Sequence, residues 1–73
     1  MKSKDEKLLK LLGKRIKYLR KKEKISQAQL AFEAGIPRLQ VSRIERGAIN
    51  TGILTLVAIA EALNVQTKEL LHF

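Results

Sequence analysis

The 73-residue sequence contains no cysteine, no tryptophan, a single proline and few aromatic residues (Tyr18, Phe32 and Phe73). Without cysteine, the chain forms neither a disulfide scaffold nor a thiolate zinc site, and it has no cysteine nucleophile. So few aromatic rings require a core of aliphatic side chains. The longest nearly apolar run, residues 53–60, is far shorter than the roughly 20 residues of a membrane-spanning helix. These absences favour one small cytoplasmic domain over residues 1–73.

Acidic residues are also scarce, and their scarcity is uneven. Fifteen Lys and Arg residues outnumber seven Asp and Glu residues, which gives a net charge of +8. Residues 1–46 hold 14 of the basic residues and five acids, hence +9, whereas residues 47–73 hold one lysine against two glutamates, hence −1. A potential concentrated on one part of a small domain attracts polyanions. Nucleic acid and an anionic membrane surface are therefore the candidate partners, beside a merely soluble basic domain.

Helical periodicity covers nearly the whole chain, and no alternation of polar and apolar residues argues for a strand. The spacing of Leu9, Leu12, Ile16 and Leu19 predicts an amphipathic helix over about residues 5–23, with a loose N-terminus over residues 1–6. Four shorter helices are predicted after it, over about 26–34, 37–46, 53–63 and 67–71. The prediction is an all-α, compact five-helix bundle.

The residues expected to cap these helices and to form the turns between them can be named. Ser26 followed by Gln29 has the spacing of a capping box, and Gly35 suits the left-handed turn that ends a helix. Pro37 is suited to open the next helix, so the second and third helices should be joined by a tight turn. Asn50 or Thr51 is the expected cap of the fourth helix, which is apolar almost all round and should form the buried centre.

The third helix should have two different faces. At about 100° per residue, Val41 and Ile44 lie together and should face the core. The opposite face carries Leu39, Ser42, Arg43 and Arg46, with Arg38 on its flank. Arginine bonds guanine bidentately and an apolar side chain contacts the thymine methyl, so this face is suited to a nucleic-acid groove. The alternative is an ordinary solvated surface.

The segments SQAQLAFEAG (26–35) and VSRIERG (41–47) resemble the helix-turn-helix of the Cro/repressor (XRE) family. The pattern of that family is SQ..LA...G, followed by an apolar-Ser-x-apolar-Glu-x-Gly segment. LGKRIKYLR (12–20) is similar to its first helix, and the resemblance extends over about residues 12–71. It implies a lambda-repressor-like domain with the motif at about 26–46. It also implies a transcriptional regulator that binds double-stranded DNA sequence-specifically.

The resemblance implies roles for individual side chains on the DNA. Arg38, Leu39 and Arg43 match positions that reach base edges in the major groove. Ser42, which lies on the same face of the helix, is added as a fourth candidate for base reading. Gln27 matches the position that bonds a DNA phosphate, and the further phosphate candidates are Arg46, Lys24 and some of Lys14, Lys17 and Lys21. Two departures weaken the phosphate contacts. Pro37 replaces a small polar residue, and the loop over 48–52 is less basic than in many members and lacks their proline.

Two further implications concern the framework. Arg20 and Glu45 match a salt bridge that ties the first helix to the third. Gly47 matches a tight turn where a positive φ is tolerated. A half-site of a few base pairs favours a homodimer, for which the apolar C-terminal residues Leu70, Leu71 and Phe73 are the candidate interface. The same residues would instead fold back onto the first helix in a monomer.

Other classes of function find little support. His72 is the only histidine and lies at the chain end, no GxxxxGK[ST] segment is present, and no residue spacing suggests a metal site. We therefore expect no enzymatic activity, no cofactor, no metal and no small-molecule ligand. A membrane role is disfavoured because the apolar stripe of the first helix is needed by the core. The remaining alternative is a protein-interaction module or antitoxin that uses the same fold to bind a protein partner.

Overall fold

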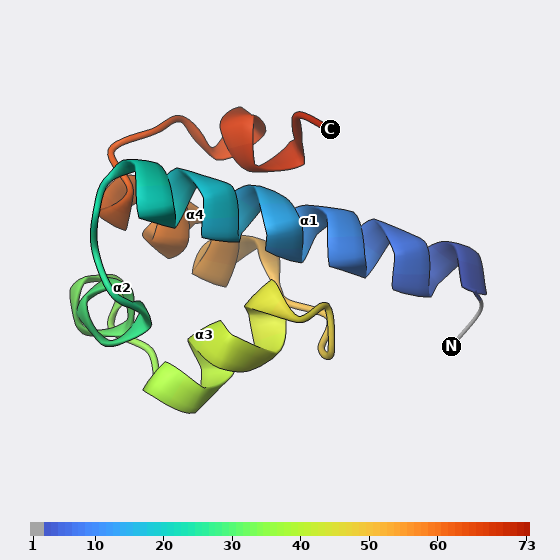
Figure 1. Cartoon of the computed structure of the whole chain (residues 1–73), viewed down its shortest axis with the longest axis horizontal. Helices are drawn as coiled ribbons and strands as arrows, with labels where there is room; N and C mark the ends of the chain where they lie inside the picture. Colours follow the sequence, from blue (N-terminus) through green and yellow to red (C-terminus); the bar gives the residue numbers. More distant parts are fainter. Residues whose placement is uncertain (1–2) are drawn as a thin grey trace.

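The computed structural model describes the backbone of residues 3–73 and the side chains of residues 5–73. It contains four α-helices and a 3-10 helix, in the order α1 (Ser3–Lys22), α2 (Gln27–Ala34), α3 (Arg38–Glu45), α4 (Ile53–Ala62) and η1 (Thr67–Leu71) (Figure 1). No strand occurs within these residues, so the all-helical prediction is confirmed. The predicted count of five helices is not confirmed, because the last segment is a five-residue 3-10 helix rather than a fifth α-helix.

The first helix is longer than predicted. Residues 3–6, which we expected in a loose terminus over 1–6, are helical, and residues 1–2 lie outside the described part of the chain. Asp5 and Glu6 stand in the first turn, where negative charge stabilises the positive end of the helix dipole. Of the predicted stripe, Leu12, Ile16 and Leu19 are buried, whereas Leu9 is only partly buried. The N-terminal turns of α1 extend past the rest of the molecule (Figure 1).

The two helices of the motif begin and end close to the predicted positions. The Ser26 hydroxyl accepts the N–H of Gln29 at 3.0 Å, and Gly35 closes α2 with a φ of 71°. The capping box is only half formed, because the Gln29 side chain donates to Glu33 rather than back to the cap. Pro37 is the N-cap of α3 rather than its first residue, so α3 begins at Arg38.

One aliphatic core holds the elements together. Its buried side chains are Leu12, Ile16, Leu19, Leu30, Ala31, Val41, Ile44, Leu56, Ile59, Ala60, Leu63 and Leu70. Within it, α2 packs against α3 and α4, while α1 packs against α3 and η1. The expectation that α4 forms the buried centre holds for Leu56, Ile59 and Ala60. It is wrong for the first turn, where Ile53 and Leu54 are 62% and 82% exposed. The cap of α4 is Gly52, not Asn50 or Thr51.

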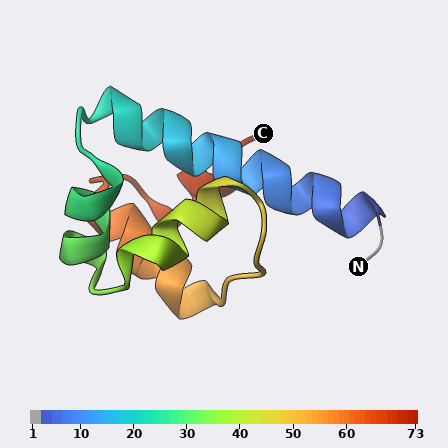
Figure 2. The same cartoon turned by 60° about the horizontal axis from the view of Figure 1, so that its bottom comes forward.

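Two glycines allow α1 to approach the C-terminal end of α3. A Cβ atom on Gly13 would lie 2.5 Å from the carbonyl oxygens of both Ile44 and Glu45. Gly47, with a φ of 71°, also lies against α1, because a Cβ atom there would lie 2.8 Å from the backbone of Lys10. The position of α3 is therefore fixed by backbone-to-backbone packing. In Figure 2, which brings the bottom of Figure 1 forward, α3 lies in the middle of the view, between α2 and the loop that leads to α4.

Candidate nucleic-acid interface

The third helix is anchored on one side and exposed on the other. Val41 and Ile44 are almost fully buried, whereas Arg38 and Arg43 are exposed. Leu39 is 55% exposed between the arginines. The helix lies at the edge of the molecule opposite η1 (Figure 1). This geometry presents guanidinium and apolar groups to a ligand while the buried side holds the helix in place. Among the residues predicted to read bases, Ser42 is the most enclosed, at intermediate burial.

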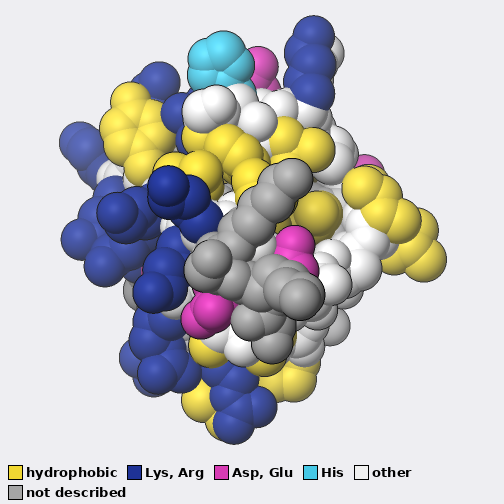
Figure 3. All heavy atoms as spheres, turned by 90° about the vertical axis from the view of Figure 1, so that its right-hand side faces the viewer, with side chains coloured by type: hydrophobic (Ala, Val, Ile, Leu, Met, Phe, Trp, Pro, Cys, Tyr) yellow, Lys and Arg dark blue, Asp and Glu magenta, His cyan; other side chains and the backbone are white. Residues whose placement is uncertain are grey.

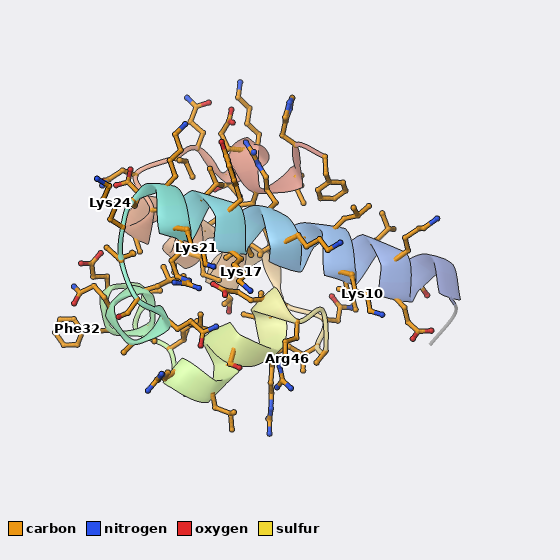
Figure 4. All side chains as sticks on the ribbon, in the orientation of Figure 1. Lys10, Lys17, Lys21, Lys24, Phe32 and Arg46 are labelled. Carbon is orange, nitrogen blue, oxygen red and sulfur yellow. The ribbon has the colours of Figure 1, made fainter. Side chains whose placement is uncertain are left out.

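Basic side chains surround this helix unevenly. Arg46 extends from the end of α3 away from α1, and its Nε donates to the Ser42 carbonyl at 3.4 Å (Figure 4). Lys10, Lys17 and Lys21 extend along the part of α1 that faces α3 (Figure 4). Lys24 lies beyond the end of α1, in the turn to α2, with a φ of 60°. Of the predicted phosphate contacts, Lys24 is therefore the one set apart from α3.

The distribution of charge follows the sequence. In the end view of Figure 3, Lys and Arg side chains gather along one side of the molecule and at its lower edge, and few lie on the other side. The uncharged loop and first turns of α4 contribute no basic residue, since residues 47–60 contain none. The positive potential is thus one-sided, as the charge partition of the sequence indicates.

A buried ion pair connects the helices of the motif to α1. Arg20 donates from Nε to Glu45 Oε2 at 2.7 Å and from Nη2 to Glu45 Oε1 at 3.0 Å. Its third bond runs from Nη1 to the Ile25 carbonyl at 2.9 Å, in the turn before α2. Both charged residues are less than one-tenth exposed. The hydrogen bond to Glu45, aided by its charge and opposed by desolvation, raises the pKa of Arg20 above its ordinary alkaline value.

Gln27 joins this pair, a contact that the sequence analysis missed. Its Nε2 donates to Glu45 Oε1 at 3.0 Å, so one carboxylate accepts from α1 and from the first residue of α2. The sequence carries only a weak signal of this contact, because the family pattern relates Arg20 to Glu45 and Gln27 to a DNA phosphate, but does not relate Gln27 to Glu45. The half-buried state of Gln27 also follows from this bond.

A second connection holds η1 on α1 and was likewise not predicted. Arg15 Nε donates to the Glu69 carbonyl at 2.8 Å, and its Nη2 bonds Glu69 Oε1 at 3.3 Å. The guanidinium also lies over the Tyr18 ring, 5.5 Å from its centroid. Such cation–π contacts add to the pairing of a partly buried arginine. The C-terminal segment is therefore attached to the first helix by a specific side chain.

Features of other functional classes are sparse in residues 3–73. None of the helices there is both long and apolar enough to cross a membrane. Over the same residues, no three His, Cys, Asp or Glu side chains are grouped to hold a metal ion. An open cavity of about 280 Å³ lies beside the first turns of α1, lined by Asp5, Leu8, Leu9 and Asn50. It is formed by residues other than the exposed ones of α3.

Two short helices joined by a tight turn, the second with one buried and one basic exposed face, define a helix-turn-helix DNA-binding module. The sequence profile of the family described as Helix-turn-helix matches residues 16–70. The chain belongs to this Cro/repressor-type family of DNA-binding transcriptional regulators.

Similar proteins include regulators of known kinds. The control protein C.BamHI of Bacillus amyloliquefaciens is 41% identical over 64 residues, which are 86% of this chain and 79% of that protein. The immunity repressor protein of Bacillus phage phi105 is 42% identical over 78% of this chain, but over only 40% of the repressor. The crystal structure of the restriction-modification controller protein C.AhdI from Aeromonas hydrophila matches with a TM-score of 0.84 and 35% identity. That match covers 85% of this chain and 94% of C.AhdI.

Proposed function

We propose that this regulator acts as a repressor or restriction-modification controller whose α3 enters the DNA major groove. The observation that carries the proposal is that α3 is anchored by Val41 and Ile44 while its opposite face is basic and exposed. The residues proposed to read base edges are Arg38, Leu39, Ser42 and Arg43. Arginine recognises guanine O6 and N7, and Leu39 suits a thymine methyl group. The names of the relatives support this class of regulator.

Phosphate contacts would hold α3 in register on the duplex. We assign them first to Gln27 and Arg46, which flank α3 at the start of α2 and at the end of α3. The lysines of α1 add a longer-range attraction, and Lys14, Lys17 and Lys21 are its candidates. Lys24 is also a candidate, but its position in the α1–α2 turn makes its contribution the smallest. Phosphate contacts fix position and orientation without reading the sequence.

The protein would bind as a homodimer, because one short helix reads only a few base pairs. The interface expected from the sequence needs one correction. Leu70 is fully buried and belongs to the core of each protomer, so it is not available to a partner. Leu71 and Phe73 are more than half exposed, and we propose that they contact the second copy. The dimer would work in the cytoplasm, without cofactor or enzymatic activity.

Selection of bound duplexes from a random pool, followed by fluorescence anisotropy at several salt concentrations, tests this function. We expect one enriched, two-fold symmetric site and an affinity that falls steeply as salt rises. Enrichment of no sequence, with weak binding to every duplex, would contradict a sequence-specific regulator. That result would instead favour the protein-interaction module or antitoxin, for which partner capture is the direct assay.

A further inference from the structure

The buried carboxylate of Glu45 has more bonds than an interhelix ion pair needs. Arg20 occupies both of its oxygens, and the Gln27 amide takes a third bond to Oε1 at 3.0 Å. These three residues come from α1, from the first position of α2 and from the last position of α3. The network therefore runs from the framework of the fold to the residue assigned to a DNA phosphate.

The chemistry of an amide explains what this bond does. A glutamine side chain carries a carbonyl acceptor and an NH₂ group with two donors. Only the NH₂ group forms a favourable contact with a carboxylate, so Glu45 fixes which end of the amide points inward. One N–H is then held by Glu45 Oε1, and the other N–H of the same nitrogen remains for a phosphate oxygen. The rotamer and the flip of Gln27 are set before DNA arrives, which lowers the entropy lost on binding.

The charge of the network also suits an anionic ligand. A lone carboxylate beside the start of α2 would repel a phosphate. Arg20 neutralises it through two hydrogen bonds, and both partners are buried. The first turn of α2 contributes backbone N–H groups without intrahelical partners, which favour a negative charge. A phosphate placed beside Gln27 would therefore meet an oriented donor and a local charge close to zero.

We propose that Glu45 is a positioning residue for DNA binding, which holds one N–H of the Gln27 amide so that the other bonds a phosphate. This inference rests on the proposed function, since it concerns the same DNA contact. It assigns to Glu45 a role beyond the ion pair with Arg20. A purely structural Glu45 would leave the contribution of Gln27 to DNA affinity independent of it.

The test is a set of variants measured on one operator by fluorescence anisotropy. Q27A alone should weaken binding about tenfold, the effect of losing one hydrogen bond to a charged group. The background for comparison is R20M/E45M, because apolar residues of similar volume commonly replace a buried ion pair without loss of stability. In that background, Q27A should cost less than about twofold, and the background itself should bind about tenfold more weakly at an unchanged melting temperature.

Gln29 supplies the matched control. It lies two residues further along α2, and its amide bonds Glu33 on the exposed surface rather than Glu45. Q29A should leave DNA affinity unchanged in both the wild type and the R20M/E45M background. If Q27A weakens binding by the same factor in both backgrounds, Glu45 does not position Gln27. If no variant or wild-type protein shows salt-dependent DNA binding, the proposed function itself fails, which is a distinguishable result.

A second measurement does not depend on the stability of any variant. In the free wild-type protein, the Gln27 amide proton bonded to Glu45 should resonate away from the position of a solvated glutamine amide and should exchange with water more slowly than the second proton of the same nitrogen. Signals that match those of a freely solvated glutamine amide would overturn the positioning role. If R20M/E45M does not fold, the NMR signals of the wild type alone decide the question.

Discussion

At the scale of single residues, Arg43 and Arg46 should have different roles although their side chains are the same. Arg43 lies on the exposed face of α3, beside Leu39 in the middle of the expected groove contact. Arg46 lies just after the last turn, where its guanidinium also bonds the backbone of α3. A contact to a base edge discriminates between sequences, whereas a contact to phosphate does not. Loss of Arg43 should therefore change the sequence preference of binding, whereas loss of Arg46 should change only the affinity.

We expect Arg43→Ala to cost about 1–3 kcal/mol on the selected operator and to relax the preference at one base pair. Arg46→Ala should weaken binding about equally on all sequences and reduce the salt dependence by about one phosphate contact. Binding isotherms on the operator and on its single-base variants measure both effects. A uniform loss for Arg43→Ala would show that Arg43 contacts phosphate and not a base.

Removing one partner of the ion pair between Arg20 and Glu45 should lower the free energy of unfolding strongly. Arg20→Ala leaves a buried carboxylate without its charge partner, and such losses cost about 3–5 kcal/mol. Urea unfolding followed by circular dichroism measures this loss. The sign with pH follows from the raised pKa of Arg20: its stabilisation is fully present below its unfolded pKa and is lost only in strong alkali. An unchanged unfolding midpoint for Arg20→Ala would argue against a stabilising pair.

At the scale of elements, the contact of α1 with α3 depends on a missing side chain. Gly13 stands inside α1, where alanine would ordinarily gain about 1 kcal/mol. Its Cβ would, however, lie 2.5 Å from two backbone oxygens of α3, which cannot move aside as a flexible side chain would. The clash therefore outweighs the gain in helix propensity, and α3 would have to shift.

We expect Gly13→Ala to destabilise the protein by about 1–3 kcal/mol and to weaken DNA binding further by displacing α3. The control is Gly52→Ala, since an added Cβ there meets nothing within 4 Å and costs only a weaker helix cap. Thermal unfolding and operator affinity measure the two variants side by side. Equal effects of the two substitutions would contradict the packing argument.

The elements also show what a single sequence can and cannot predict. The cap at Ser26 and the left-handed Gly35 were predictable, because capping depends on residues close together in the chain. The exposure of Ile53 and Leu54 was not, because an all-round apolar pattern does not say which turns another element covers. The bond from Gln27 to Glu45 joins positions 18 apart in sequence, and periodicity carries no information about it. The exposed face of α3 was predicted from its helical wheel alone.

At the scale of the whole molecule, the leucines of η1 separate folding from association. Leu70 is fully buried and Leu71 is exposed, although the two are neighbours. We expect Leu70→Ala to lose about 2–5 kcal/mol of folding stability, as for other large-to-small core substitutions. Leu71→Ala should leave stability nearly unchanged and raise the dimer dissociation constant. Thermal unfolding and sedimentation velocity separate these outcomes. A wild-type protein that stays monomeric at high micromolar concentration, with and without DNA, would contradict the proposed dimer.

The way η1 is attached has a consequence for how such proteins diversify. Arg15 holds η1 chiefly through a hydrogen bond to the main-chain oxygen of Glu69, and the side chain of Leu70 is buried in the core. Neither the hydrogen bond from Arg15 nor the packing of Leu70 depends on which side chains stand at the exposed positions 71 and 73. These two positions can therefore change without loss of the fold. If they form the proposed dimer interface, related regulators in one cell could evolve side chains there that let each pair only with itself, while α3 stays the same.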